Sequence, residues 1–103
     1  MAGELNGKVA LVTGASRGIG AAIARGYAER GALVVGAARS TDQLRELEAT
    51  NPERISTATV DLRDAESLNS LVDLVVERHG GIDILVNNAG VAPKADFATE
   101  PIE

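Results

Sequence analysis

The sequence contains no cysteine, a single histidine and very few aromatic residues, which make up 2% of its 103 positions. The absence of cysteine excludes disulfide bonds and thiolate metal ligands, and one histidine does not make a metal site, so we predict none. With so few aromatic rings, the core must be built from Val, Leu, Ile and Ala. This composition is typical of a parallel sheet that helices cover on both faces.

Long apolar runs and a basic composition are also missing. The formal net charge is −5 at pH 7, which argues against a surface that binds nucleic acid or an anionic membrane. No apolar run approaches the length that spans a bilayer, and the first seven residues, MAGELNG, lack both the basic and the apolar region of a signal peptide. We therefore expect one small domain that is soluble and cytoplasmic.

The chain does have a regular alternation of short apolar runs and amphipathic segments. Alternation of this kind predicts a parallel sheet flanked by helices, in the Rossmann-like, doubly wound α/β class. The expected strand order is 3-2-1-4, and ligands of such open sheets bind where the order reverses, between the first and fourth strands. Strands are predicted near 8–13, 32–38, 55–60 and 82–87, and helices near 18–30, 42–50 and 64–79.

Capping and turn residues mark the expected helix ends. Asp64 is the predicted N-cap of the third helix, because aspartate accepts hydrogen bonds from the first backbone N–H groups of a helix. Gly80 and Gly81 are expected to end that helix, since glycine is favoured just past a helix C-terminus. The second helix is expected to end at Asn51, because the residue before a proline leaves the helical conformation.

The connection between the first strand and the first helix carries three glycines, in the sequence TGASRGIG at residues 13–20. A strand that turns through glycines directly into a helix N-terminus forms an anion site, because N–H groups point outward and the missing Cβ atoms let a phosphate approach. The pattern G-x-x-x-G-x-G on its own also fits a tight turn without a ligand. No Lys-Ser/Thr pair follows the last glycine, which excludes a P-loop.

Three further motifs follow the other predicted strands. They are ARS at 38–40, VDL at 60–62 and NNAG at 87–90. The carboxyl ends of parallel strands meet at one edge of a sheet, which is where open α/β sheets bind their ligands. We therefore expect the glycine turn and these three motifs to form one site.

At these motifs the chain resembles the amino-terminal half of the short-chain dehydrogenase/reductase family, whose hallmarks are T-G-x-x-x-G-x-G and N-N-A-G. The resemblance runs from about Lys8 to the last residue. It implies a nicotinamide dinucleotide cofactor, with adenine beside the VDL motif and ribose beside the NNAG motif, which also braces the sheet through Thr13. The cofactor-binding residues that we predict are Gly14, Ser16, Arg17, Gly18, Ile19, Gly20, Arg39, Ser40, Asp61, Leu62, Asn88, Ala89 and Gly90.

Arg39 indicates which dinucleotide to expect. Sheets of this kind that bind NAD carry an acidic residue near the end of the second strand, but that position falls here at Ala38 or Arg39. Arginine suits a 2′-phosphate, which it binds through charge-assisted hydrogen bonds, and Arg17 is a second cation. In the family, basic residues at these two places accompany NADP. We predict that the chain prefers NADP(H) over NAD(H). The alternative for Arg39 is a solvated loop residue without a ligand. For Asp61, the alternative to an adenine contact is a purely local role in a turn.

The proton-transfer residues that the resemblance implies are not found in this sequence. The family uses a tyrosine and a lysine four residues apart, with a serine upstream, whereas the only tyrosine, Tyr27, is followed at that spacing by Gly31. We therefore assign no catalytic residue. Residues 1–103 are expected to form a dinucleotide-binding half-domain, truncated before the catalytic segment of an oxidoreductase that interconverts a carbonyl and an alcohol.

The alternative is a stand-alone, non-catalytic dinucleotide-binding or assembly module. In both cases the outer edge of the fourth strand is expected to lack a neighbour within this sequence. An exposed apolar strand edge is a template for pairing with another chain. We therefore predict self-association through that edge.

Overall fold

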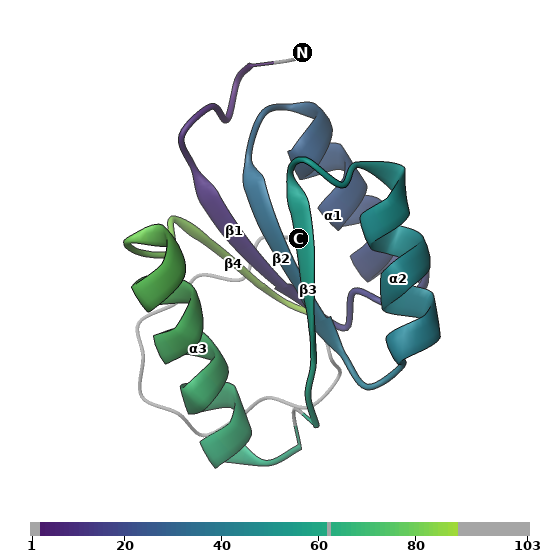
Figure 1. The fold of residues 1–103 in the computed structure, drawn as a ribbon, viewed down its shortest axis with the longest axis vertical. Coiled ribbons are helices and arrows are strands. Elements are labelled where there is room, and N and C mark those ends of the chain that lie inside the picture. Colours follow the sequence, from purple (N-terminus) through teal and green to yellow (C-terminus); the bar gives the residue numbers. More distant parts are fainter. Residues whose placement is uncertain (1–2, 62, 89–103) are drawn as a thin grey trace.

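Within residues 3–61 and 63–88, which the computed structural model describes, the four apolar runs form one sheet and the amphipathic segments form three helices (Figure 1). None of these described helices is long and apolar enough to cross a membrane. The strands are β1 (Val9–Thr13), β2 (Leu33–Ala38), β3 (Ile55–Thr59) and β4 (Ile84–Asn87). The helices are α1 (Gly18–Glu29), α2 (Thr41–Thr50) and α3 (Ala65–His79).

The strand order is β3-β2-β1-β4, and every neighbouring pair is parallel. The predicted Rossmann-like fold class and strand order are therefore confirmed. The largest difference from the predicted bounds is at the start of β4, which was expected at residue 82 and begins at Ile84. Asp83 explains the difference, because its carboxylate accepts the Val9 N–H at 2.8 Å in place of a strand carbonyl. The second helix ends at Thr50 with Asn51 as its C-cap residue, so the predicted stop before Pro52 is confirmed.

β1 lies in the middle of the sheet and is buried along its whole length. Successive side chains of a strand point to opposite faces, so Ala10 and Val12 pack with residues of α1 and α2, whereas Val9 and Leu11 pack with residues of α3. Figure 1 shows α1 and α2 on one side of the sheet and α3 on the other. Burial on both faces explains why the run is continuously apolar.

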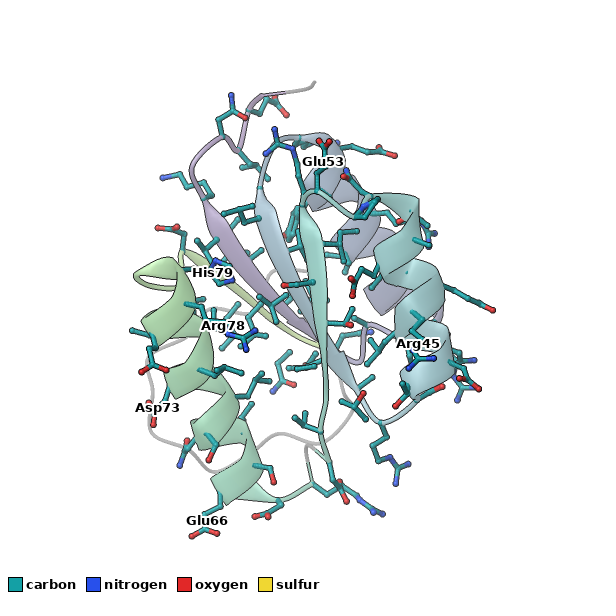
Figure 2. The ribbon with its side chains drawn as sticks, in the orientation of Figure 1. Arg45, Glu53, Glu66, Asp73, Arg78 and His79 are labelled. Carbon is teal, nitrogen blue, oxygen red and sulfur yellow. The ribbon has the colours of Figure 1, made fainter. Side chains whose placement is uncertain are left out.

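The ends of α3 are capped as the sequence predicts. The Asp64 carboxylate accepts the backbone N–H of Glu66 at 3.0 Å. Gly80 adopts a left-handed conformation with φ +86° and ends the helix. Glu66 lies in the first turn and Arg78 and His79 in the last, so the charges at both ends complement the helix dipole (Figure 2).

Among the described residues, β4 pairs only with β1, in a register that begins at Ala10 and Ile84. Its residues Ile84 and Leu85 are half-buried, whereas the corresponding part of β1 is fully buried. Pairing of the second edge of β4 with another chain stays a prediction.

Small residues line the face of α1 that packs on the sheet. Ala21, Ala24 and Ala28 are buried there, which lets the helix backbone approach the strands closely. At Gly20 the approach is so close that a Cβ atom would overlap the backbone carbonyl of Gly14. The third glycine of the turn is therefore required by packing of α1 against the turn that precedes it.

Two glycine-to-alanine substitutions in α1 are expected to have opposite effects on stability. Gly20→Ala forces the helix away from Gly14 and should lower the free energy of unfolding by about 1–3 kcal/mol, the usual range for an overpacked site. Gly26→Ala is the control, since its Cβ would meet only the flexible end of Arg30, at 3.3 Å. It should raise stability by about 0.5–1 kcal/mol, because alanine has the higher helix propensity. Urea denaturation of both variants measures the difference, and equal effects would contradict the packing role of Gly20.

Candidate functional site

The carboxyl ends of all four strands surround one cavity of about 750 Å³. It lies where the strand order reverses, since β1 has β2 on one side and β4 on the other. Ligands of open α/β sheets bind at this point of the fold. The lining residues are Gly14, Ser16, Arg17, Gly18, Ala38, Arg39, Ser40, Gln43, Val60, Asp61, Arg63 and Asn88.

The structure brings most of the predicted cofactor-binding residues to this cavity. Those that line it are Gly14, Ser16, Arg17, Gly18, Arg39, Ser40, Asp61 and Asn88. Ile19 is not among the lining residues and is 71% exposed, and Gly20 is buried beneath the turn. Leu62, Ala89 and Gly90 lie outside the described residues. Contact of any of these residues with a cofactor stays a prediction.

The N-terminus of α1 is built to leave backbone N–H groups unoccupied. The N-cap residue, Arg17, is extended and its side chain makes no capping hydrogen bond. By contrast, the side chain of Ser40 caps α2 and that of Asp64 caps α3. A Cβ atom placed on Gly18 would meet no atom of a described residue within 4 Å, so no described residue fills the space beside the turn. These features fit an anion at the start of α1.

The cavity is cationic although the chain as a whole is acidic. Among the described residues, three arginines line it, Arg17, Arg39 and Arg63, against the one carboxylate of Asp61. Neither Arg17 nor Arg39 forms an ion pair or a side-chain hydrogen bond with another described residue. Their guanidinium groups are therefore available to an anionic ligand.

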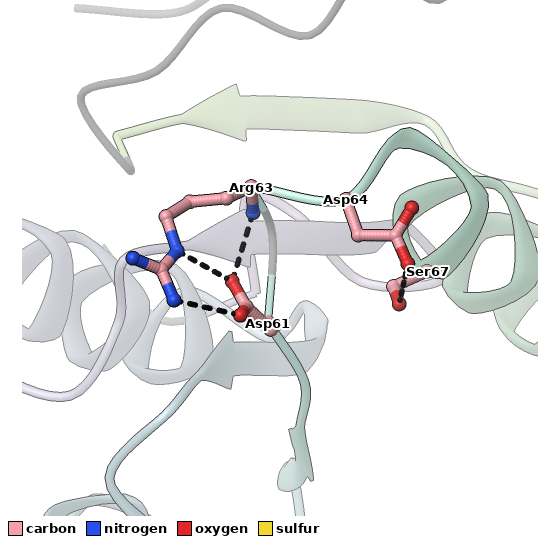
Figure 3. A network of polar contacts seen from close by, with 4 residues as sticks. All are labelled: Asp61, Arg63, Asp64 and Ser67. Carbon is pink, nitrogen blue, oxygen red and sulfur yellow. Dashed lines mark hydrogen bonds and ion pairs between the residues drawn. The ribbon is translucent and has the colours of Figure 1, made fainter.

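Asp61 and Arg63 form a compact pair at the rim of the cavity, shown in Figure 3. The carboxylate accepts two hydrogen bonds from the Arg63 side chain, Nε to Oδ1 and Nη2 to Oδ2, both at 3.0 Å. It also accepts the Arg63 backbone N–H at 3.1 Å. These hydrogen bonds from Arg63, with a smaller effect of the charges of Arg63 and Arg39, lower the pKa of Asp61 to about 2. The turn role that the sequence left open for Asp61 is thus present in the structure.

Arg63 and Gln43 were missed by the sequence reasoning. Gln43 lies in the first turn of α2, where its backbone N–H donates to the Ser40 hydroxyl at 3.4 Å. Arg63 follows Asp61 by two residues, and their opposite charges were the sequence feature that could have indicated an ion pair. Whether two residues at this spacing pair depends on the backbone conformation between them, which the local sequence pattern does not specify.

The Thr13 hydroxyl joins β1 to β4 at the floor of the site. Thr13 is 2% exposed, and its Oγ1 lies 3.1 Å from Asn87 Oδ1 and 3.3 Å from the Val86 carbonyl oxygen, so its one proton serves these acceptors. The same oxygen accepts the Asn88 N–H at 2.9 Å. The bracing that the resemblance implied for Thr13 is therefore confirmed, and it fixes the backbone of Asn88 beside the cavity.

Comparison with known proteins identifies the family. The sequence model of the short chain dehydrogenases matches residues 8–103. The chain belongs to the short chain dehydrogenase family. It spans 39% of the length of a curated relative from Aedes aegypti and 34% of the length of one from Anopheles gambiae.

Two curated relatives illustrate the range of this short chain dehydrogenase family. Farnesol dehydrogenase of Aedes aegypti is 43% identical over 95 residues, which cover 88% of this chain and 39% of that protein. The 3-oxoacyl-(acyl-carrier-protein) reductase of Vibrio cholerae is 45% identical over 88 residues, which cover 85% of this chain and 36% of that protein. The sequence is thus similar to enzymes with quite different names.

Solved structures agree with this assignment. A metagenomic short-chain oxidoreductase in complex with NADP has a TM-score of 0.80 and 44% identity, with 84% of this chain and 41% of that chain covered. L-sorbose reductase of Gluconobacter frateurii, complexed with NADPH and L-sorbose, has a TM-score of 0.76 and 43% identity, with 88% and 36% covered. Both likenesses support the Rossmann-like fold of the short chain dehydrogenases for this chain.

Replacing Thr13 by valine is expected to loosen the junction of β1 and β4. Valine keeps the volume but removes the hydroxyl, so the free energy of unfolding should fall by about 1–2 kcal/mol. The backbone N–H of Asn88 should also exchange with solvent faster, which NMR-detected hydrogen exchange measures. Thr13→Ser keeps the hydroxyl and is the control: it should preserve the protection of the Asn88 N–H. Equal protection in both variants would show that the hydroxyl does not hold this backbone.

The carboxyl group of Asp61 is expected to titrate at about pH 2. Because the folded-state pKa is below the ordinary aspartate value of 3.8, the pair stabilises the fold above pH 3.8, and its contribution is lost as the pH falls through about 2. NMR titration of the Asp61 side-chain carbon measures this pKa. Arg63→Gln should raise it toward 3.8, whereas Arg78→Gln, in the last turn of α3, should leave it unchanged. An unshifted Asp61 pKa in Arg63→Gln would contradict the assigned cause.

Proposed function

We propose that this chain is the NADP(H)-binding portion of a short chain dehydrogenase that interconverts a carbonyl and an alcohol. The observation that carries the proposal is the convergence of the glycine turn, Arg17 and Arg39 on one cavity at the carboxyl edge of the sheet. The names of two relatives support the reaction class, since one is a dehydrogenase of farnesol and one a reductase of a 3-oxoacyl group.

The diphosphate of the cofactor is assigned to the start of α1. Gly14 and Gly18 have φ angles of +65° and +63°, so the turn needs glycine at both places and presents backbone atoms to the cavity. The uncapped N-terminus of α1 supplies N–H donors, and the helix dipole favours the negative charge. A cavity of about 750 Å³ is within the usual size range of cofactor clefts.

The 2′-phosphate is assigned to Arg39, with Arg17 as the second cation. Both line the cavity and neither has an ionic partner among the described residues. Ala38, before Arg39, carries no carboxylate that would accept the two ribose hydroxyls of NAD. These residues favour NADP(H) over NAD(H).

The remaining lining residues are assigned to the adenosine and to the ribose near the nicotinamide. Asp61 follows the end of β3 by two residues and lines the same cavity as Arg39, whose charge contributes to its low pKa. We assign the Asp61 carboxylate to the amino group of adenine. Asn88, held by Thr13, is assigned to the second ribose. The nicotinamide, when bound, supplies the hydride chemistry, and the residues of this chain hold and orient the cofactor.

Substitution of Arg39 tests the cofactor preference. Arg39→Ala should weaken NADPH binding about tenfold, the effect of losing one charge-assisted contact at an exposed site, and leave NADH binding unchanged. Fluorescence titration of the purified chain with both dinucleotides measures this, with 2′-phospho-AMP and AMP as competitors. Arg45→Ala is the control, because Arg45 is an exposed arginine of α2 that does not line the cavity. An equal loss for NADPH and NADH in Arg39→Ala would contradict the assignment of the 2′-phosphate.

A further inference from the structure

Arg63 donates three hydrogen bonds to the carboxylate of Asp61 at the rim of the cavity. Every hydrogen bond that the structure gives to this carboxylate comes from Arg63. The backbone N–H and the side-chain Nε both donate to Oδ1, and Nη2 donates to Oδ2 (Figure 3). Both side chains are well exposed, at 65% for Arg63 and 46% for Asp61, so burial does not explain the pair.

The lone pairs of the Asp61 carboxylate that Arg63 does not use are the positions at which a ligand can donate a hydrogen bond. Each carboxylate oxygen has two lone pairs and so accepts about two hydrogen bonds. Oδ1 already accepts two and Oδ2 accepts one. One position therefore remains, and it is on Oδ2.

We propose that Arg63 is a positioning residue that presents one remaining acceptor, on Oδ2 of Asp61, to the exocyclic amino group of the purine bound in this cavity. The proposal rests on the proposed function, which assigns the adenine to Asp61. It adds that the choice between an amino and a keto group on the purine is made by Asp61 and Arg63 together. An amino group donates to Oδ2, whereas a keto oxygen faces a carboxylate that has no proton to offer.

The contact through both the backbone and the side chain is what makes Arg63 suited to this role. A single exposed ion pair is mobile and contributes little. Here a planar guanidinium makes two parallel bonds while the backbone N–H of the same residue makes a third. The carboxylate is thereby fixed relative to the chain before a ligand binds, which lowers the entropy lost on binding.

Arg63 also neutralises a charge that would oppose the cofactor. Arg17 and Arg39 line the same cavity and are assigned to phosphate groups. An unpaired carboxylate lining the same cavity would repel those phosphates, because like charges repel each other. The second possible role, in which Arg63 leaves Asp61 and binds a phosphate directly, is one of the outcomes that the experiment distinguishes.

The experiment compares two ligands, NADPH and its analogue in which hypoxanthine replaces adenine, so that a keto group stands in place of the amino group. Fluorescence titration gives the ratio of their dissociation constants for each form of the chain. The original sequence should prefer NADPH about tenfold, which is the effect of one hydrogen bond to a charged group. Asp61→Ala should reduce this ratio to about one.

Arg63→Gln should reduce the ratio to below about threefold, because Asp61 then rotates freely. Arg63→Lys should reduce it as well, since an ammonium keeps the charge but cannot make two parallel bonds. Lysine should nevertheless keep more of the NADPH affinity than glutamine does, because it still neutralises Asp61. Arg78→Gln removes the same charge from the last turn of α3 and should leave both ligands unaffected.

Three results would overturn the inference, and they separate it from the proposed function. If Arg63→Gln weakens NADPH and the analogue equally, Arg63 contacts a phosphate and does not position Asp61. If Arg63→Lys keeps the full preference for adenine, charge alone is responsible. If the original sequence binds NADPH but shows no preference for adenine, only the role of Asp61 and Arg63 fails, whereas a chain that binds neither ligand overturns the proposed function together with this inference.

Discussion

Parallel pairing of all four strands is the constraint on which the site depends. Because every strand runs in the same direction, residues that follow β1, β2, β3 and β4 meet at one edge although they lie far apart in the sequence. In an antiparallel sheet the same motifs would be divided between two edges. The buried Thr13 hydroxyl joins the ends of β1 and β4 through hydrogen bonds, at the point where the strand order reverses.

Packing and binding place different demands on the glycine turn. Gly20 is needed because α1 approaches the preceding backbone too closely for a Cβ atom, and the buried alanines of α1 continue that close contact. Gly14 and Gly18 are needed for their positive φ angles. The helix that results has no capping side chain, unlike α2 and α3, so its first N–H groups are left for a ligand at some loss of helix stability.

The charges that line the cavity, and not the net charge of the chain, determine which ligands the site attracts. The chain carries a formal charge of −5, yet three arginines line the cavity at the carboxyl edge of the sheet. One of them is paired with Asp61 and two have no ionic partner among the described residues. A surface that is acidic on average can therefore attract an anion to one place, because the field inside a concave site is set by the groups that line it.

The sequence by itself determined the alternation of elements, the helix ends and the glycine turn, because these depend on hydrophobic period, capping and backbone freedom, which neighbouring residues set. It also indicated eight of the residues that line the cavity, since motifs after parallel strands share one edge. Only the tertiary structure decided that Gly20 packs beneath the turn, that Ile19 is exposed and is not among the lining residues, and that Arg63 and Gln43 line the cavity. Those facts depend on distances between backbone segments, which no periodic pattern in the chain specifies.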